Sequence, residues 1–141
     1  MIDTHAHLNF PPLLDQIDTT IKESKKAGLT GIVIASSNLK DSIASVELAK
    51  KYPDFLYASV GIHPQNTDTQ NNSPIEEQIK KLDSQLTTNY LLLATKIVAI
   101  GETGLDFSPA PEGESDRSHK EQEKLFLGQI DLAIKYKLPL I

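Results

Sequence analysis

The chain has 141 residues and no cysteine, which excludes a disulfide-stapled fold, thiolate metal ligands and a cysteine nucleophile. Charged residues make up 23% and hydrophobic residues 39%, a composition typical of globular rather than disordered proteins. The net charge of −5 argues against binding nucleic acid or an anionic membrane over a broad basic surface. At about 100–200 residues per domain, this length predicts one domain.

The first residues carry neither the basic start nor the apolar stretch of a secretory signal. The longest apolar cluster, residues 90–94, is far shorter than a membrane span. We therefore expect a soluble, cytoplasmic protein with no membrane partner.

Strand-like runs recur along the chain. A short first strand is expected over residues 1–7. Apolar runs beside glycine or proline predict strands buried on both faces at residues 31–35, 55–62 and 97–101. Residues 138–141 begin a further strand.

Helical spacing separates these runs. Gly28 is placed to end a first helix, and a second helix, marked by Ile43, Val46 and Ala49, ends near Pro53. A third helix carries one apolar face at a spacing of three and four residues. That face comprises Ile75, Ile79, Leu82, Leu86, Tyr90 and Leu93.

Capping boxes are predicted at the starts of the third and fourth helices. Ser73, Pro74 and Glu76 provide the first, and Ser118 with Glu121 provides the second. Each box precedes apolar residues that we interpret as core. In the fourth helix these are Leu125, Phe126, Ile130, Ala133 and Ile134.

The predicted element order is β-α-β-α-β-α-β-α-β, which indicates an α/β fold with a parallel sheet and right-handed crossovers. An open doubly wound sheet and a (β/α) barrel both fit, and periodicity does not choose between them. The irregular stretch 106–117 follows a strand, where α/β folds place functional loops.

The first strand ends in chemistry-bearing residues. Asp3, His5 and His7 alternate with other residues, so an extended backbone points all three to one side. Two imidazoles on one face can share a metal ion, and Asp3 could orient one of them by accepting its second ring N–H. The alternative is a polar strand end exposed to solvent.

Two later strands end in a similar way. His63, in G-I-H-P, could contact a substrate anion, ligate a metal, move a proton, or only pack at a strand–loop junction. Glu102 follows a buried strand, where a carboxylate needs a metal ion or a basic partner. Asp106 could orient Glu102 or a water molecule, or cap the next turn. His119 is interpreted as a solvated side chain.

The chain carries four motifs, which are D-T-H-A-H, G-I-H-P, G-E-T-G-L-D-F, and E-Q-E-K-L-F-L-G-Q-I-D-L-A followed by K-L-P-L-I. Together they resemble the TatD family of metal-dependent deoxyribonucleases, which are amidohydrolase-type barrel hydrolases. The resemblance covers residues 2–141. It implies a partial (β/α)8 TIM-type barrel with about four βα units plus the start of a fifth strand. Residues 1–141 would then be the N-terminal part of a single barrel domain.

The same resemblance implies residue roles. His5 and His7 would hold one divalent ion, and Glu102 would bridge two, of magnesium, manganese or zinc. His63 would contact the substrate phosphate, which makes Glu102 and His63 the catalytic candidates. Metal-activated water would cleave DNA, single-stranded or at 3′ ends. The supporting acids behind the ligands would be Asp3 and Asp106.

Family members continue after the L-P strand with a histidine–x–arginine segment, another histidine and a late aspartate, none of which lies in this chain. A complete barrel of this kind typically has about 250 residues. We therefore expect the chain to carry half of the metal ligands, to expose strand edges, and to need the remainder of the barrel for nuclease activity. An in-frame continuation carrying histidine–x–arginine would favour the nuclease.

Two other functions remain open. A related barrel hydrolase could use the same metal half-site on a small ester, amide or lactone, with the loop 106–117 deciding the substrate. A truncated, non-catalytic product could bind one metal ion weakly or serve as an interaction module, which a stop codon after Ile141 would favour.

Overall fold

The computed structural model describes residues 1–66, 73–93, 96–109 and 117–141. Its strands are β1 (Ile2–Ala6), β2 (Gly31–Ile34), β3 (Leu56–Val60) and β4 (Ile97–Ile100). Its helices are the 3-10 turn η1 (Leu14–Gln16), α1 (Ile17–Lys26), α2 (Leu39–Lys51), α3 (Ile75–Leu93) and α4 (His119–Tyr136). The four helices and the first four strands are therefore present as predicted, with the strands somewhat shorter than the apolar runs suggested.

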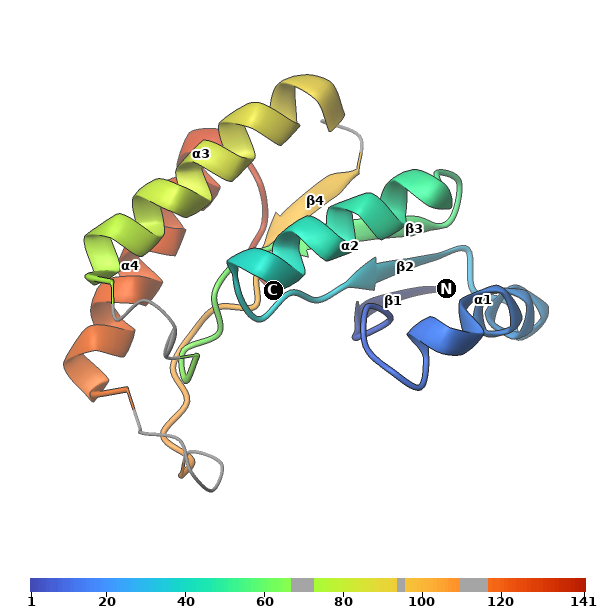
Figure 1. Cartoon of the computed structure of the whole chain (residues 1–141), viewed down its shortest axis with the longest axis horizontal. Helices are drawn as coiled ribbons and strands as arrows, with labels where there is room; N and C mark the ends of the chain where they lie inside the picture. The colour runs from blue at the N-terminus through green and yellow to red at the C-terminus, as the bar shows by residue number, and fades with distance from the viewer. Residues whose placement is uncertain (67–72, 94–95, 110–116) are drawn as a thin grey trace.

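The four strands are parallel and lie in the order β1-β2-β3-β4, so each pairs with the next along the chain. A doubly wound sheet would reverse its strand order, so the sequential order favours barrel-type winding. The helices follow the same sequence, from α1 at the right of Figure 1 to α3 and α4 at the left. Beside β4, Leu140 forms a parallel bridge to Ile100, where the fifth strand was expected.

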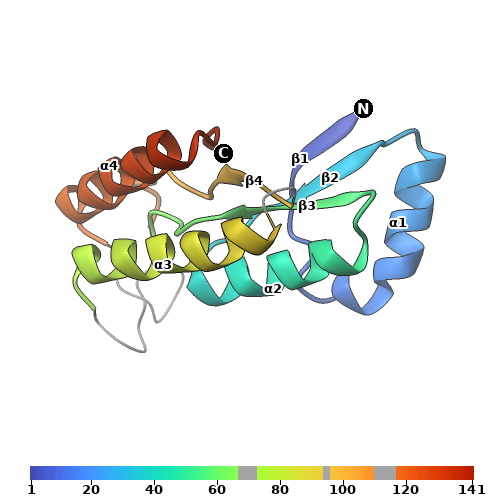
Figure 2. The same ribbon diagram turned by 90° about the horizontal axis from the view of Figure 1, so that it is seen from above.

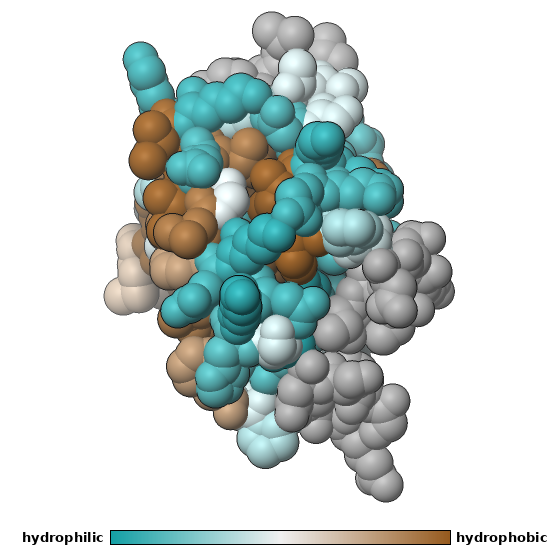
Figure 3. Space-filling view, turned by 90° about the vertical axis from the view of Figure 1, so that its left-hand side faces the viewer, coloured by the Kyte–Doolittle hydropathy of each residue, from teal (hydrophilic) through white to brown (hydrophobic). Residues whose placement is uncertain are grey.

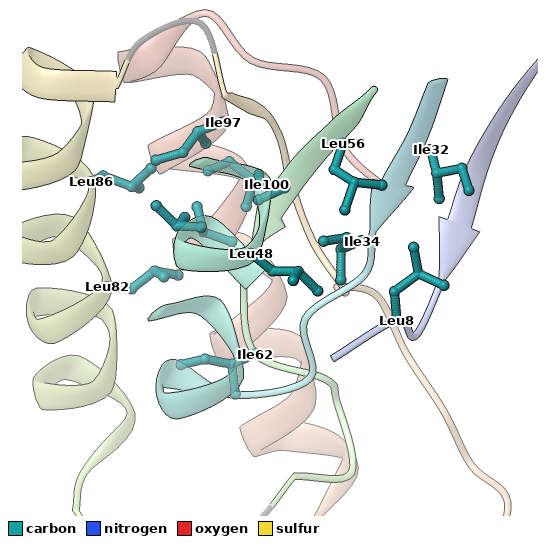
Figure 4. Close-up of a cluster of buried hydrophobic side chains, with 14 of the residues drawn as sticks. Leu8, Ile32, Ile34, Leu48, Leu56, Ile62, Leu82, Leu86, Ile97 and Ile100 are labelled. Atoms are coloured by element: carbon teal, nitrogen blue, oxygen red, sulfur yellow. The ribbon is translucent and has the colours of Figure 1, made fainter. Parts of the chain in front are cut away.

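The core lies between the strands and the helices. Strands β2, β3 and β4 are largely buried, as their continuous apolar runs predict, whereas the edge strand β1 is largely exposed. Leu82 and Leu86 of α3 point toward Ile97 and Ile100 of β4 (Figure 4). Figure 2 shows α1, α2 and α3 arranged along the strands. No helix in the described parts of the chain is long and apolar enough to cross a membrane.

Two predicted helix ends are confirmed. Gly28 follows α1 with a φ of +94°, a left-handed conformation that glycine adopts without strain. At the start of α4, Ser118 accepts a hydrogen bond from the main-chain N–H of Glu121, whose carboxylate accepts one from the N–H of Ser118. Local sequence alone determines both ends, because every partner lies within a few residues.

The capping box predicted at α3 is wrong. The hydroxyl of Ser73 is buried and has no hydrogen-bond partner among the described residues. The Glu76 carboxylate pairs instead with Lys124 of α4, and this hydrogen bond is the main cause that lowers the pKa of Glu76. A tertiary partner therefore replaces the local one.

Two residues predicted to face the core are exposed. Ile43 on α2 keeps 49% of its surface exposed and Ile134 on α4 keeps 72%. Figure 3 shows the side formed by α3 and α4, where hydrophobic surface lies open beside hydrophilic side chains. The prediction read every apolar residue of each stripe as core, whereas no described residue covers most of Ile134. Tyr90 and Leu93 of the predicted α3 face lie outside the described side chains.

A polar cluster joins α3 to α4. Both Asp83 carboxylate oxygens accept hydrogen bonds from Lys135, at 2.7 and 2.8 Å, and the Tyr136 hydroxyl lies 2.7 Å from Asp83 Oδ1. The bonds from Lys135 and then Tyr136 lower the pKa of Asp83 below its ordinary value of 3.8. The carboxylate is thus stabilised in the folded state relative to the unfolded chain.

Acid should therefore weaken this helix contact. A carboxylate whose pKa is lower in the folded than in the unfolded state stabilises the fold fully at pH values above the unfolded pKa. This stabilisation is lost as the pH falls through the folded pKa. Between pH 6 and pH 3, we expect the free energy of unfolding of the wild-type chain to fall by about 0.5–1 kcal/mol more than that of Asp83→Asn. The difference is small because the Asp83–Lys135 pair is partly exposed. Urea unfolding of both proteins across this range measures the difference. A gap that stays constant with pH would contradict the prediction.

Candidate metal centre

The first part of the site is the carboxyl end of β1. His5 lies on this strand and His7 follows it, and their rings are 5.3 Å apart at an interplanar angle of 81°. Their side chains are 48% and 43% exposed. One carboxylate oxygen of Asp3 accepts the main-chain N–H of His5 at 3.0 Å. The structure thus shows Asp3 holding the strand end, and its predicted contact with a histidine ring stays a prediction.

Glu102 reaches the site because the chain turns across the sheet after β4. Its main-chain N–H donates to the carbonyl of Ser36, beyond β2, at 2.7 Å. The buried hydroxyl of Ser59 donates to the Gly101 carbonyl at 2.8 Å. A Cβ atom on Gly61 would lie 2.5 Å from the carbonyl carbon of Gly101, so this close crossing requires glycine. Glu102 is left largely buried, with 15% of its side chain exposed.

These turns bring the three side chains together. His5 Nε2 lies 2.9 Å from Glu102 Oε1, and His7 Nε2 lies 3.9 Å from the same oxygen. One ligand atom from each residue lies within 4.8 Å of the other two. Although β1 and β4 are opposite edge strands of the four-stranded sheet, the segment after β4 crosses toward β2 and so carries Glu102 to the end of β1.

The donor set fits a divalent cation. Zinc binds imidazole nitrogen and carboxylate oxygen at about 2.0–2.2 Å, so two ligands of one ion lie at most about 4 Å apart. The two separations from Glu102 Oε1, 2.9 Å to His5 and 3.9 Å to His7, lie within that limit. No second group of three or more such side chains is present in the described ranges.

His63 lies just beyond β3, at the carboxyl ends of the strands, as His7 and Glu102 do. Its Nδ1 accepts the main-chain N–H of Gln65 at 3.2 Å. A neutral imidazole with Nδ1 as acceptor carries its proton on Nε2, so His63 presents an N–H donor on its other side. That Nε2 lies 3.9 Å from Oδ2 of Asp106.

Asp106 therefore lies beside His63, and the structure gives it no contact with Glu102 among the described residues. Its Oδ1 accepts the main-chain N–H of Ser108 at 2.9 Å and the hydroxyl of Ser108 at 2.6 Å. These bonds, and more weakly the nearby His63, hold the pKa of Asp106 below its ordinary value. Of the roles predicted for Asp106, turn capping is thus the one for which the structure shows hydrogen bonds. Residues 110–116 of the loop lie outside the described residues.

Two buried glutamines of α4 hold these loops, and the sequence analysis did not identify them. The Gln129 side chain accepts the N–H of Ile62 at 2.8 Å and donates to the Ile62 carbonyl at 2.9 Å. Gln122 makes the same pair of bonds with the main chain of Asp106, at 2.8 and 2.7 Å. Both glutamines are only 1% exposed. Polar residues seven positions apart on a buried helix face are the sequence signal that would have identified them.

His119 is exposed, as predicted, at the start of α4. Its ring also packs on that of Phe107, with centroids 3.9 Å apart and an interplanar angle of 36°. This contact joins the loop after β4 to the N-terminal turn of α4.

The family of the chain follows from a comparison with known proteins. A family model described as TatD related DNase matches residues 2–141. The chain belongs to this family. The resemblance of the strand-end motifs, and the α/β fold of four parallel βα units that it implied, are both confirmed.

Curated relatives match the chain almost completely. It is 30% identical over 139 residues to the 3'-5' ssDNA/RNA exonuclease TatD of Pectobacterium parmentieri, covering 99% of this chain and 48% of that protein. It is 34% identical over 136 residues to an uncharacterized metal-dependent hydrolase of Mycoplasma pneumoniae, covering 96% and 47%. The chain spans about half the length of these curated relatives.

A solved structure shows the same arrangement. The crystal structure of YjjV, a TatD homolog from Escherichia coli K12, superposes with a TM-score of 0.79 at 28% identity. The match covers 99% of this chain and 49% of that one. The four βα units therefore correspond to about half of a TatD-family structure.

Proposed function

We propose that the chain contributes to a divalent-metal-dependent deoxyribonuclease of the TatD type, which hydrolyses phosphodiester bonds from the 3′ end of single-stranded DNA. The observation that carries the proposal is the grouping of His5, His7 and Glu102, with ligand atoms within 4.8 Å of one another. Membership of a family of metal-dependent hydrolases supports it. A cytoplasmic location is part of the same proposal.

His5 and His7 would bind one ion through ring nitrogens, and the Glu102 carboxylate would complete this half of the site. A bound divalent ion supplies Lewis acidity for phosphodiester hydrolysis by water. We propose two ions of magnesium, manganese or zinc, with Glu102 between them. The second ion needs ligands beyond this group, which we assign to the half of the barrel that the aligned relatives possess in addition.

His63 is the proposed contact to the substrate phosphate. Its Nε2–H lies on the side of the ring away from the Gln65 N–H, as the acceptor role of Nδ1 requires. A hydrogen bond from this N–H to a phosphoryl oxygen would orient the phosphodiester and stabilise the charge that develops during hydrolysis. Asp106 Oδ2 lies 3.9 Å from the same Nε2, beyond hydrogen-bond distance, so its carboxylate would act only as a negative charge beside His63.

The test is a hydrolysis assay on a 5′-labelled single-stranded oligonucleotide with magnesium, manganese or zinc. A parallel panel contains an ester, an amide and a lactone. Where the coding sequence continues past Ile141, the longer chain is assayed. We expect shortening from the 3′ end that depends on the ion and falls at least about tenfold in Glu102→Gln, since loss of even a partner that supports a metal ligand costs about 10–100-fold.

The matched control is Glu123→Gln, which removes the charge of an exposed glutamate on α4, outside the three-ligand group. This variant should keep full activity. Turnover of the ester, amide or lactone without turnover of DNA would overturn the proposed substrate. DNA cleavage that survives Glu102→Gln unchanged would overturn the proposed site.

A further inference from the structure

An aromatic pair begins one residue beyond Asp106, the neighbour of the proposed phosphate contact His63. Phe107 keeps 58% of its surface exposed, although it is a large apolar residue. The ring of His119, itself exposed, packs against it at a centroid distance of 3.9 Å. The pair therefore forms an open aromatic platform supported from one side.

The main chain that carries the platform is tied to Asp106, the neighbour of His63. Phe107 directly follows Asp106, whose Oδ2 lies 3.9 Å from Nε2 of His63. The Asp106 main chain is held by both polar groups of Gln122, and its side chain is held by Ser108. His119 starts the same helix that carries Gln122. Both rings are thus anchored to elements that also position the proposed phosphate contact.

We propose that Phe107 and His119 form a stacking subsite for an unpaired nucleobase of the substrate. This inference rests on the proposed function and specifies how the site would distinguish a nucleotide from another phosphate ester. Every base has a π-face, so stacking on an aromatic ring binds single strands with little sequence preference. Because a paired base is already stacked within its duplex, the platform favours single-stranded ends.

Stacking requires the aromatic ring of Phe107, and exposed apolar surface in general would not provide it. Leu105 lies two residues before Phe107 in the same loop and is 47% exposed. It offers apolar area without a π-face. The two residues thus allow the contribution of the ring to be separated from that of hydrophobic contact.

The experiment is an NMR titration of the chain with thymidine 5′-monophosphate and, separately, with 2-deoxyribose 5-phosphate, which lacks the base. Magnesium is present in both. We expect the resonances of His63 to shift with both ligands, and those of Phe107 and His119 to shift with thymidine monophosphate only. Phe107→Leu should weaken binding of thymidine monophosphate about fivefold or more and leave 2-deoxyribose 5-phosphate unaffected.

Leu105→Ala is the control and should bind both ligands as the wild-type chain does. If His63 responds to both ligands but the two aromatic rings respond to neither, the stacking subsite is wrong and the phosphate contact stands. If the His63 resonances shift with neither ligand, the assignment of His63 as the phosphate contact in the proposed function is wrong. A Leu105→Ala variant that is weakened as much as Phe107→Leu would replace stacking with general hydrophobic contact.

Discussion

Replacing Glu102 by glutamine is expected to weaken binding of Mn²⁺ to the chain at least about tenfold. The change keeps the size of the side chain and one oxygen, but it removes the negative charge that faces both histidines. Glu102 Oε1 lies 2.9 Å from His5 and 3.9 Å from His7, so this oxygen is the centre of the group. Isothermal titration calorimetry, or the loss of the free Mn²⁺ signal in electron paramagnetic resonance, measures the affinity.

Two further variants complete this test. His5→Ala should weaken binding to a similar extent, because it removes a ligand from the same group. Glu123→Gln, on the exposed side of α4, should bind as the wild-type chain does. Equal affinity in the wild-type and Glu102→Gln chains would show that Mn²⁺ binds elsewhere, and the three-ligand site would be abandoned.

The strand ends that carry this site were predictable from the sequence. Alternation places His5 and His7 on one side of an extended strand, and a run of buried residues before Glu102 locates the end of another. Parallel strands bring their carboxyl ends to one edge, so their approach follows from the fold class. The sequential strand order that favours the barrel over the doubly wound sheet depends on pairing between distant segments.

What sequence reasoning missed depends on contacts between distant residues. Glu76 leaves its predicted cap because Lys124 of another helix lies within reach. Asp106 caps its turn through Ser108, which is one of its predicted roles, but its neighbour across space is His63, which the sequence did not indicate. Neither partner is near in the sequence, and neither pairing has a spacing that reveals it. The same holds for Gln129, whose partners are the main-chain groups of another strand end.

Replacing Gln129 by methionine is expected to destabilise the chain by about 2–4 kcal/mol, since each buried polar group left without a partner costs about 1–3 kcal/mol. Methionine retains the length and apolar volume of the side chain. It leaves the N–H and carbonyl of Ile62 unpaired, together with the hydroxyl of Thr103, which lies 2.8 Å from Gln129 Nε2. Urea unfolding measures the change in free energy.

Gln85→Met on α3 provides the matched comparison. Gln85 is only partly buried and donates one hydrogen bond, to the Leu39 carbonyl at 3.2 Å, so its loss should cost about 1 kcal/mol or less. Gln129→Met should also move the NMR signals of His63, because Ile62 precedes it directly, whereas Gln85→Met should not. Equal destabilisation by the two substitutions, with His63 unmoved in both, would mean that Gln129 only fills space. A larger loss with a displaced His63 would instead establish that α4 sets the position of the proposed phosphate contact.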